Sequence, residues 1–183
     1  MSRPLVRLVP LIVTATLPAP VQAWADGLRA AHYPAQRNRV PAHVTLFQTL
    51  PGSALAEVRA LLASLAQSAM PPDARLAGVM DLDTGTAVRI ESPAMLALRR
   101  DIADHLHGLL TLQDSHAPRL HVTIQNKVSV AEARALQRQM AASFAPLAFA
   151  FAGLALHHYR DGFWEDAGQW AFRGGGRRWA QRR

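Results

Sequence analysis

The sequence HVTLF at residues 43–47 recurs as HVTIQ at residues 121–125. In each copy a His and a Thr alternate with apolar residues, which is typical of a β-strand with one buried face. His43 and Thr45 therefore share one face of their strand, and His121 and Thr123 share one face of theirs. One His-x-Thr pair would arise by chance in about one such sequence in three, so it is the second copy that carries information.

The segments around the two copies also resemble each other. The first half reads as a strand at 11–17, a helix at 20–32, a polar loop, the first His-x-Thr strand and a helix at 53–69. The second half reads as a strand at 86–91, a helix, a polar loop, the second His-x-Thr strand and another helix. From Leu11 to His43 is 32 positions, and from Thr86 to His121 is 35. The spacing predicts a duplicated unit that contributes one copy of the strand from each half.

Three helix starts have sequence signals. Ser53 is a candidate N-cap for the helix at 53–69, and Ser92-Pro93 pairs an N-cap with Pro at the first helical position. Ser129 and Glu132 form a capping box. We expect the helix after Ser92 to bury Met95, Leu98, Ile102, Leu106 and Leu109. Two strands at 149–159 and 168–173, joined by a turn at 160–167, complete the predicted elements.

These elements predict an α+β fold. We expect a bilobal, duplicated unit with two antiparallel sheets around a central cleft and helices on the outside. The predicted single domain covers residues 1–172, with lobes of roughly 1–80 and 81–172, and residues 173–183 form a basic, flexible tail. We expect the protein to be a monomer.

Composition excludes several kinds of chemistry. The 183 residues contain no Cys, which excludes disulfides, thiolate nucleophiles and Cys-based zinc sites. The net charge of +7 is almost wholly due to Arg, because Lys127 is the sole lysine, and it favours anionic partners such as phosphates. No apolar stretch reaches the ~18 residues needed to span a bilayer, so we expect no membrane partner.

The N-terminus allows two interpretations. Residues 1–25 have the outline of a secretory signal, with two Arg followed by an apolar run and small residues. However, the β-branched run at 11–17 has the length of a strand and is followed by a helix pattern. We therefore expect a strand here and a cytoplasmic protein.

Two His and two Thr facing one cleft would suit a phosphodiester substrate. One neutral imidazole can take a proton from the attacking hydroxyl or water, while a protonated one gives a proton to the departing oxygen. The Thr hydroxyls can donate hydrogen bonds to the non-bridging phosphate oxygens. This chemistry needs no metal and no cofactor. The alternative is that both His fill ordinary core positions.

Other residues are candidates for substrate binding. Strand alternation places Phe47 on the His43 face, and Gln125 and Lys127 on the His121 face. Phe47 could stack on a base, although a Phe in a strand is more often part of the core. Further candidates near the cleft are Arg39, Arg119, Tyr159 and Trp164, for which solvated or packing roles are the alternatives. The remaining His residues do not have the spacing of metal ligands, and we expect no metal site.

The paired H-V-T-L and H-V-T-I, together with RNRVPAHVTLFQTLP, HVTIQNKV and GLALHHYRDGFWE, resemble the 2′-5′ RNA ligase family, also called the 2H phosphoesterases. The resemblance covers about residues 10–172. It implies a bilobal α+β fold with His43, Thr45, His121 and Thr123 as catalytic residues. The second motif ends in Ile124 where the family more often has Leu, a conservative change at a core position.

The resemblance implies a metal-independent cyclic phosphodiesterase that hydrolyses 2′,3′-cyclic or related phosphodiesters of nucleotides or RNA ends. The same groups would also serve a 2′-5′ RNA ligase, and a non-catalytic RNA or nucleotide-binding protein is a third interpretation. Partners would then be RNA ends or small nucleotides. The sequence alone does not assign which His is the acid and which is the base.

Overall fold

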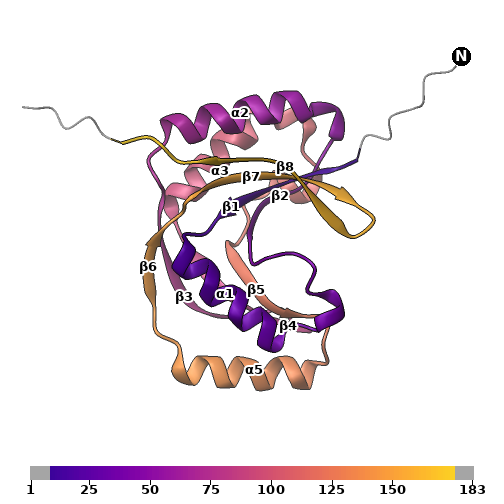
Figure 1. The fold of residues 1–183 in the computed structure, drawn as a ribbon, viewed down its shortest axis with the longest axis vertical. Coiled ribbons are helices and arrows are strands. Elements are labelled where there is room, and N and C mark those ends of the chain that lie inside the picture. The colour runs from indigo at the N-terminus through magenta and orange to yellow at the C-terminus, as the bar shows by residue number, and fades with distance from the viewer. Residues whose placement is uncertain (1–8, 176–183) are drawn as a thin grey trace, which may run out of the picture.

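The computed structural model describes residues 9–175, which form two four-stranded antiparallel sheets and five α-helices (Figure 1). The first sheet has the order β2 (Val44–Leu50), β1 (Leu11–Thr16), β7 (Gly153–Arg160), β8 (Phe163–Ala171). The second has the order β5 (His121–Asn126), β4 (Gly85–Glu91), β3 (Asp73–Asp81), β6 (Leu147–Ala150). The predicted α+β class with two antiparallel sheets is confirmed.

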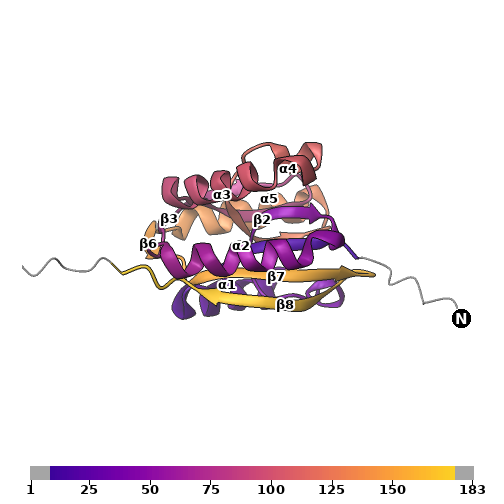
Figure 2. The ribbon, with the colours of Figure 1, turned by 90° about the horizontal axis from the view of Figure 1, so that it is seen from above.

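The helices are α1 (Ala19–His32), α2 (Leu55–Ser68), α3 (Pro93–His105), α4 (Leu112–Ser115) and α5 (Val130–Ser143). Short 3₁₀ turns lie at Ala35–Arg37, Gly52–Ala54 and His107–Leu109. The helix α2 packs on β7 and β8, and α5 packs on β3 and β4, at opposite ends of the molecule (Figures 1 and 2). Both helices therefore cover the outer faces of the sheets, as expected.

The sequence suggests two lobes that divide at about residue 80, but the strand pairing does not follow this division. β3, from the first predicted lobe, belongs to the second sheet, and β7 and β8, from the second predicted lobe, belong to the first sheet. Each sheet therefore contains strands from both predicted lobes. The strand predicted at 149–159 is also split, into β6 and β7, which belong to different sheets. At the split, the Phe151 amide donates to Pro72 and the Ala152 amide donates to Thr16. These two hydrogen bonds fix the backbone where the chain passes from the second sheet to the first.

The local signals at the helix starts are correct in two cases of three. The Ser92 hydroxyl accepts from the Met95 amide, and Ser129 and Glu132 form the predicted capping box. Ser53 does not cap α2, because it lies within a 3₁₀ turn and the helix begins at Leu55.

The predicted bounds of two other elements differ from those in the structure. The helix α3 ends at His105, which leaves Leu109 exposed in a 3₁₀ turn instead of buried. The predicted turn at 160–167 is shorter, because β8 begins at Phe163.

The chain ends are described only in part. Residues 1–8 of the possible signal segment and residues 176–183 of the predicted tail lie outside the described residues. The amides of Arg173 and Gly174, at the start of that tail, donate to carbonyls at the end of α2. Between residues 9 and 175, no helix combines the length and apolar character that crossing a membrane requires.

Two buried arginines connect each His-x-Thr strand to a helix from the other half of the chain. Arg29 of α1 donates to the Thr123 carbonyl of β5 at 2.8 Å, and Arg99 of α3 donates to the Leu46 carbonyl of β2 at 3.4 Å. Their exposed fractions are only 3% and 4%. Arg29 also donates to Asn38 and Val40, and Arg99 lies 4.3 Å from the Phe47 ring centre. We call these two residues the arginine cross-links.

Replacing either cross-link should destabilise the fold. Arg29→Met or Arg99→Met removes the guanidinium and leaves buried carbonyl oxygens without donors, so we expect a loss of about 2–4 kcal/mol in the free energy of unfolding, measured by urea denaturation. Arg100→Met is the matched control, because Arg100 is the exposed neighbour of Arg99. It should change stability by less than about 0.5 kcal/mol. Equal losses at positions 99 and 100 would refute the role of the cross-links.

Candidate active site

The two His-x-Thr strands are the edge strands of their sheets, and they face one cavity. His43, Thr45, His121 and Thr123 all line this cavity of about 560 Å³, which we call the cleft. β2 and β5 also contact each other across the two sheets. The structure therefore brings together all four residues that the sequence singles out.

Both imidazoles are held in the same way. The Nδ1 atom of His43 lies 2.7 Å from the Pro41 carbonyl oxygen, and the Nδ1 atom of His121 lies 2.7 Å from the Arg119 carbonyl oxygen. A carbonyl oxygen can only accept a hydrogen bond, so each Nδ1 carries a proton. Nε2 is then the nitrogen left to exchange a proton with a ligand in each ring.

Equivalent β-bulges interrupt both strands directly after the His-x-Thr motif. In β2, Phe47 and Thr45 pair with adjacent residues of β1, so Leu46 is the extra residue. In β5, Gln125 and Thr123 pair with adjacent residues of β4, so Ile124 is the extra residue. A bulge reverses the alternation of side chains beyond it.

The predicted positions of Phe47 and Gln125 are wrong for this reason. Phe47 is fully buried in the core and Gln125 is 7% exposed, and neither lines the cleft. The next residue in each strand, Gln48 or Asn126, lines the cleft instead. Strand alternation alone could not reveal this, because a bulge depends on the partner strand.

The other sequence candidates fall in different places. Arg119 lines the cleft and Trp164 lines it from β8. Arg39 lines a neighbouring cavity, and its guanidinium lies 4.7 Å from the Phe163 ring centre. Lys127 follows β5 with a positive φ of 61° and lines neither of these cavities, and the same is true of Tyr159, which is 43% exposed.

Trp164 gives the two His residues different surroundings. Its ring lies 4.4 Å from the His43 ring, centre to centre, and 5.2 Å from the His157 ring. Burial, with smaller contributions from the charges of Arg29, His157 and His121, lowers the pKa of His43 to about 4, although the Pro41 hydrogen bond opposes the shift. His43 is therefore neutral at pH 7 in the ligand-free protein.

Sequence reasoning missed a buried Arg–Asp pair in the cleft wall. The Asp114 carboxylate accepts from the amides of Gln48 and Thr49, at 2.9 and 2.8 Å, and the Arg99 guanidinium donates to the Asp114 carbonyl. Asp114 is 3% exposed and, like Arg99, lines the cleft. The segment 113–119, which begins within α4 and also places His116 at the cleft, therefore holds β2 directly after its bulge. A polar loop of ordinary composition has no sequence signal for this role.

The cleft is suited to an anion. Arg99, Arg119 and three His residues line it, and the only carboxylate in its lining, that of Asp114, already accepts two backbone amides. Among residues 9–175, no three His, Asp or Glu side chains come close enough to hold a metal ion. The donors available to a ligand are therefore imidazoles, hydroxyls, amides and guanidinium groups, which are typical phosphate ligands.

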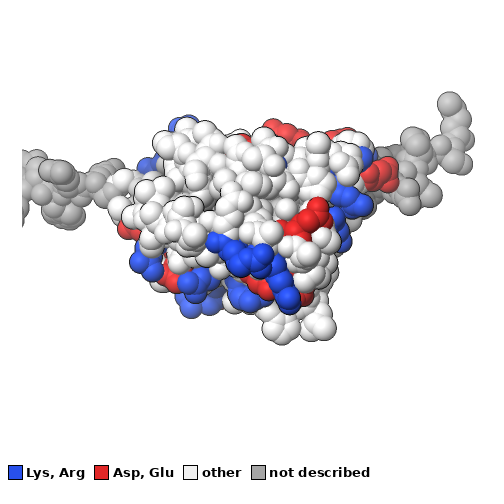
Figure 3. Space-filling model, turned by 90° about the horizontal axis from the view of Figure 1, so that it is seen from below, with Lys and Arg blue, Asp and Glu red and all other residues white. Residues whose placement is uncertain are grey.

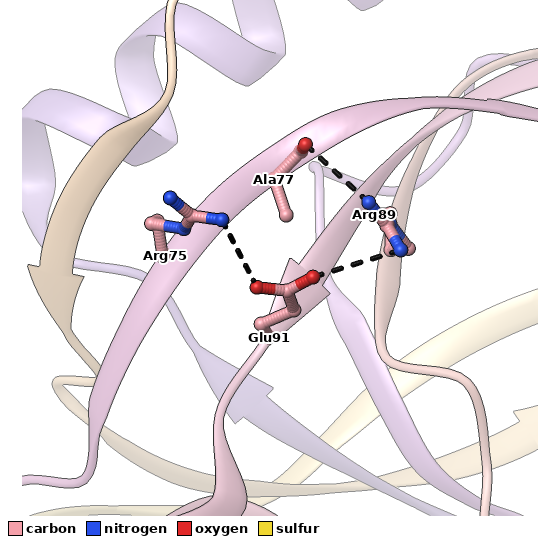
Figure 4. A network of polar contacts seen from close by, with 4 residues as sticks. All are labelled: Arg75, Ala77, Arg89 and Glu91. Carbon is pink, nitrogen blue, oxygen red and sulfur yellow. Dashed lines mark hydrogen bonds and ion pairs between the residues drawn. The ribbon is translucent and has the colours of Figure 1, made fainter.

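A cluster of charges continues from the cleft along the second sheet. Arg89 is the register partner of His121, so both side chains leave the same face. Its guanidinium lies 3.6 Å from the Glu91 carboxylate, which also pairs with Arg75 at 3.2 Å (Figure 4). All three side chains are about half exposed, so these ion pairs contribute little to stability.

On one face of the molecule, positive and negative charges lie close together. Figure 3 shows one face of the molecule, on which Lys and Arg side chains gather over one half with Asp and Glu side chains among them. The other half of this face is largely uncharged.

The comparisons with known proteins agree with this fold. The family model of the 2′-5′ RNA ligase superfamily matches residues 17–163. No curated protein matches the sequence closely enough to count as a relative.

Solved structures also match. A Thermus thermophilus protein, TT0787, is 21% identical, with a TM-score of 0.63 and coverage of 90% of this chain and 98% of its own. Escherichia coli LigT in complex with 3′-AMP is 18% identical, with a TM-score of 0.56 and coverage of 90% and 98%. LigT in complex with NADP⁺ is 15% identical, with a TM-score of 0.56 and coverage of 90% and 97%. These likenesses support the fold, and the family match covers most of the chain. The protein therefore belongs to the 2′-5′ RNA ligase superfamily.

Proposed function

We propose that this protein is a metal-independent cyclic phosphodiesterase that opens 2′,3′-cyclic phosphates of nucleotides or RNA ends. The observation that carries the proposal is the shared cleft, into which each sheet contributes one His and one Thr from equivalent edge strands. Superfamily membership adds a precedent of phosphodiester chemistry, and LigT has been crystallised with 3′-AMP and with NADP⁺. A nucleotide phosphate is thus the ligand class that fits the donors of the cleft.

In the proposed reaction each of the two imidazoles transfers a different proton. His43, neutral and packed against Trp164, takes the proton of the attacking water through Nε2. The water oxygen forms a bond to phosphorus while one ring P–O bond breaks. His121, as the imidazolium, gives its Nε2 proton to the departing ribose oxygen. The product is a phosphate monoester, and proton exchange with solvent resets both rings.

The Thr hydroxyls stabilise the charge that grows on phosphorus. Thr45 and Thr123 lie two residues after their His, on the same faces, so each hydroxyl can donate to a non-bridging oxygen while the imidazole acts on a bridging one. The arginine cross-links fix the backbone of both strands beside these residues. The geometry is therefore set before substrate binds.

A second candidate function is RNA end joining. If a 5′-hydroxyl replaces water as the nucleophile, the same groups form a 2′-5′ linkage instead of a monoester. The superfamily match favours keeping this reaction as the alternative.

Single substitutions of the two imidazoles test the proposal. With 2′,3′-cyclic AMP and EDTA, His43→Ala and His121→Ala should each lower kcat by about 10²–10⁴-fold. Thr45→Val and Thr123→Val should lower it by about 10²-fold. His107→Ala, an exposed His outside the cleft, is the matched control and should keep full activity. If the protein binds nucleotides but the unmodified protein and both His variants alike turn over cyclic phosphates only at the background rate, it is a binding protein instead.

The pH dependence tests the role of His43. Protonation of the base abolishes its function, so kcat/KM should fall as pH drops through about 4. Trp164→Ala exposes the imidazole to water, which should raise the pKa of His43 toward 6.5 and move the acidic limb of the profile upward by as much as two pH units.

NMR titration of the His43 imidazole measures its pKa directly, both in the unmodified protein and in Trp164→Ala. Trp24→Ala, at an exposed Trp of α1, is the control and should leave the titration unchanged. An acidic limb that stays at the same pH in Trp164→Ala would contradict the assignment.

A further inference from the structure

A row of register partners extends from the cleft across the open face of the second sheet. The row consists of His121 on β5, Arg89 on β4 and Gly78 on β3. The Ile90 amide donates to the Leu120 carbonyl, so Arg89 and His121, the next pair along, form a non-hydrogen-bonded pair. The Cβ atoms of such a pair lie about 4.5–5.5 Å apart. The Arg89 side chain therefore begins directly beside the candidate catalytic His121.

A second row beside the first contains three more charged residues. Arg75 on β3 and Glu91 on β4 are register partners, and the same pairing places Arg119 opposite Glu91, just before β5. The Glu91 carboxylate pairs with Arg75 at 3.2 Å and with Arg89 at 3.6 Å (Figure 4). The two rows together thus contain three guanidinium groups and one carboxylate, and this excess of positive charge favours an anion.

Arg89 has hydrogen-bond donors that the fold does not use. Among residues 9–175 its guanidinium makes one hydrogen bond, from Nη2 to the Ala77 carbonyl at 3.5 Å, besides the long ion pair with Glu91. The side chain is half exposed, so neither contact holds it strongly. A Cβ atom at Gly78 would lie 3.7 Å from Nη2 of Arg89, so the guanidinium lies over a position that has no side chain. Most of the five N–H donors of Arg89 are therefore available to a phosphate.

The proposed reaction places the ribose of the substrate on the same side as Arg89. His121 gives its proton to the departing ribose oxygen, so the ribose lies on the His121 side of the phosphorus atom. Only the ribose ring and its 5′-carbon separate the cyclic phosphate from a phosphate carried on the 5′-oxygen. The two phosphates of such a nucleotide are thus near neighbours, as His121 and Arg89 are.

We propose that Arg89, supported by Arg75 and Arg119, binds a second phosphate, which is carried on the 5′-oxygen of the nucleotide whose cyclic phosphate is opened. Arg89 is then a specificity-determining residue that takes no part in proton transfer. This inference rests on the proposed function, because it takes the cyclic phosphate to lie at His121. The second phosphate can be a terminal monoester or the link to a preceding nucleotide, and both present non-bridging oxygens to a guanidinium.

Binding of two nucleotides that differ only in the second phosphate tests the site. By calorimetry, adenosine 2′,5′-bisphosphate should bind about tenfold more tightly than adenosine 2′-monophosphate. Arg89→Met removes the guanidinium but keeps an unbranched side chain, and it should abolish most of this difference. Arg138→Met is the matched control, because it removes the same charge from an exposed position of α5, which packs on the opposite face of the second sheet. It should preserve the difference between the two ligands.

Turnover identifies the source of the second phosphate. The reference substrate is 2′,3′-cyclic AMP with a free 5′-hydroxyl, and the two others carry on the 5′-oxygen either a terminal phosphate or a 3′-5′ link to a second adenosine. A gain in kcat/KM of about tenfold with the terminal phosphate alone would assign the site to 5′-phosphorylated mononucleotides. A gain with the linked substrate as well would extend it to oligonucleotides. In either case Arg89→Met should remove the gain, and Arg138→Met should retain it.

The outcomes for the second-phosphate site and for the proposed function are separate. Equal affinities for the two nucleotides, or the same loss of bisphosphate affinity in Arg89→Met and Arg138→Met, would overturn the second-phosphate site. A gain in turnover that Arg89→Met leaves intact would also overturn it. If the unmodified protein does not hydrolyse cyclic AMP but binds the bisphosphate more tightly through Arg89, only the proposed function fails.

Discussion

The geometry of the cleft depends on two hydrogen bonds between sheets and helices that are far apart in the sequence. Arg29 reaches from α1 to the carbonyl of Thr123, and Arg99 reaches from α3 to the carbonyl of Leu46. Each bond fixes the backbone of a strand within three residues of a candidate catalytic His. Because both guanidinium groups are buried, any shift of one strand relative to its helix would leave a charge and several carbonyl oxygens unsatisfied. The distance between the two imidazoles is therefore a property of the whole fold.

His43 and His121 lie on similar strands, but their imidazoles have different surroundings. Both rings donate from Nδ1 to a carbonyl two residues earlier, so their tautomers and orientations match. The β7–β8 hairpin then adds Trp164 beside His43, and burial lowers the pKa of that imidazole. The two imidazoles thus share a tautomer but differ in what packs on them. The same Trp164 ring, together with His43, also lines a second cavity of about 590 Å³ that adjoins the cleft.

The sequence predicted the elements that depend on local patterns. Alternation identified both His-x-Thr strands, and Ser92 and Ser129 marked helix starts correctly, because capping involves residues close in the chain. The positions of Phe47 and Gln125 were mispredicted because each follows a bulge, which is fixed by pairing with another strand. The sheet assignment of β3 and the buried contacts of Arg99 and Asp114 also depend on long-range packing. These were the features that a single sequence could not reveal.

The central claim is that one phosphate contacts both imidazoles at once. It can be tested by NMR of ¹⁵N-labelled His while adenosine 2′-monophosphate is added to the unmodified protein. We expect the Nε2 resonances of His43 and His121 to shift together, with a single dissociation constant, while both Nδ1 resonances keep the signature of a donor to a carbonyl. A response from only one of the two rings, or different dissociation constants for the two, would contradict the account.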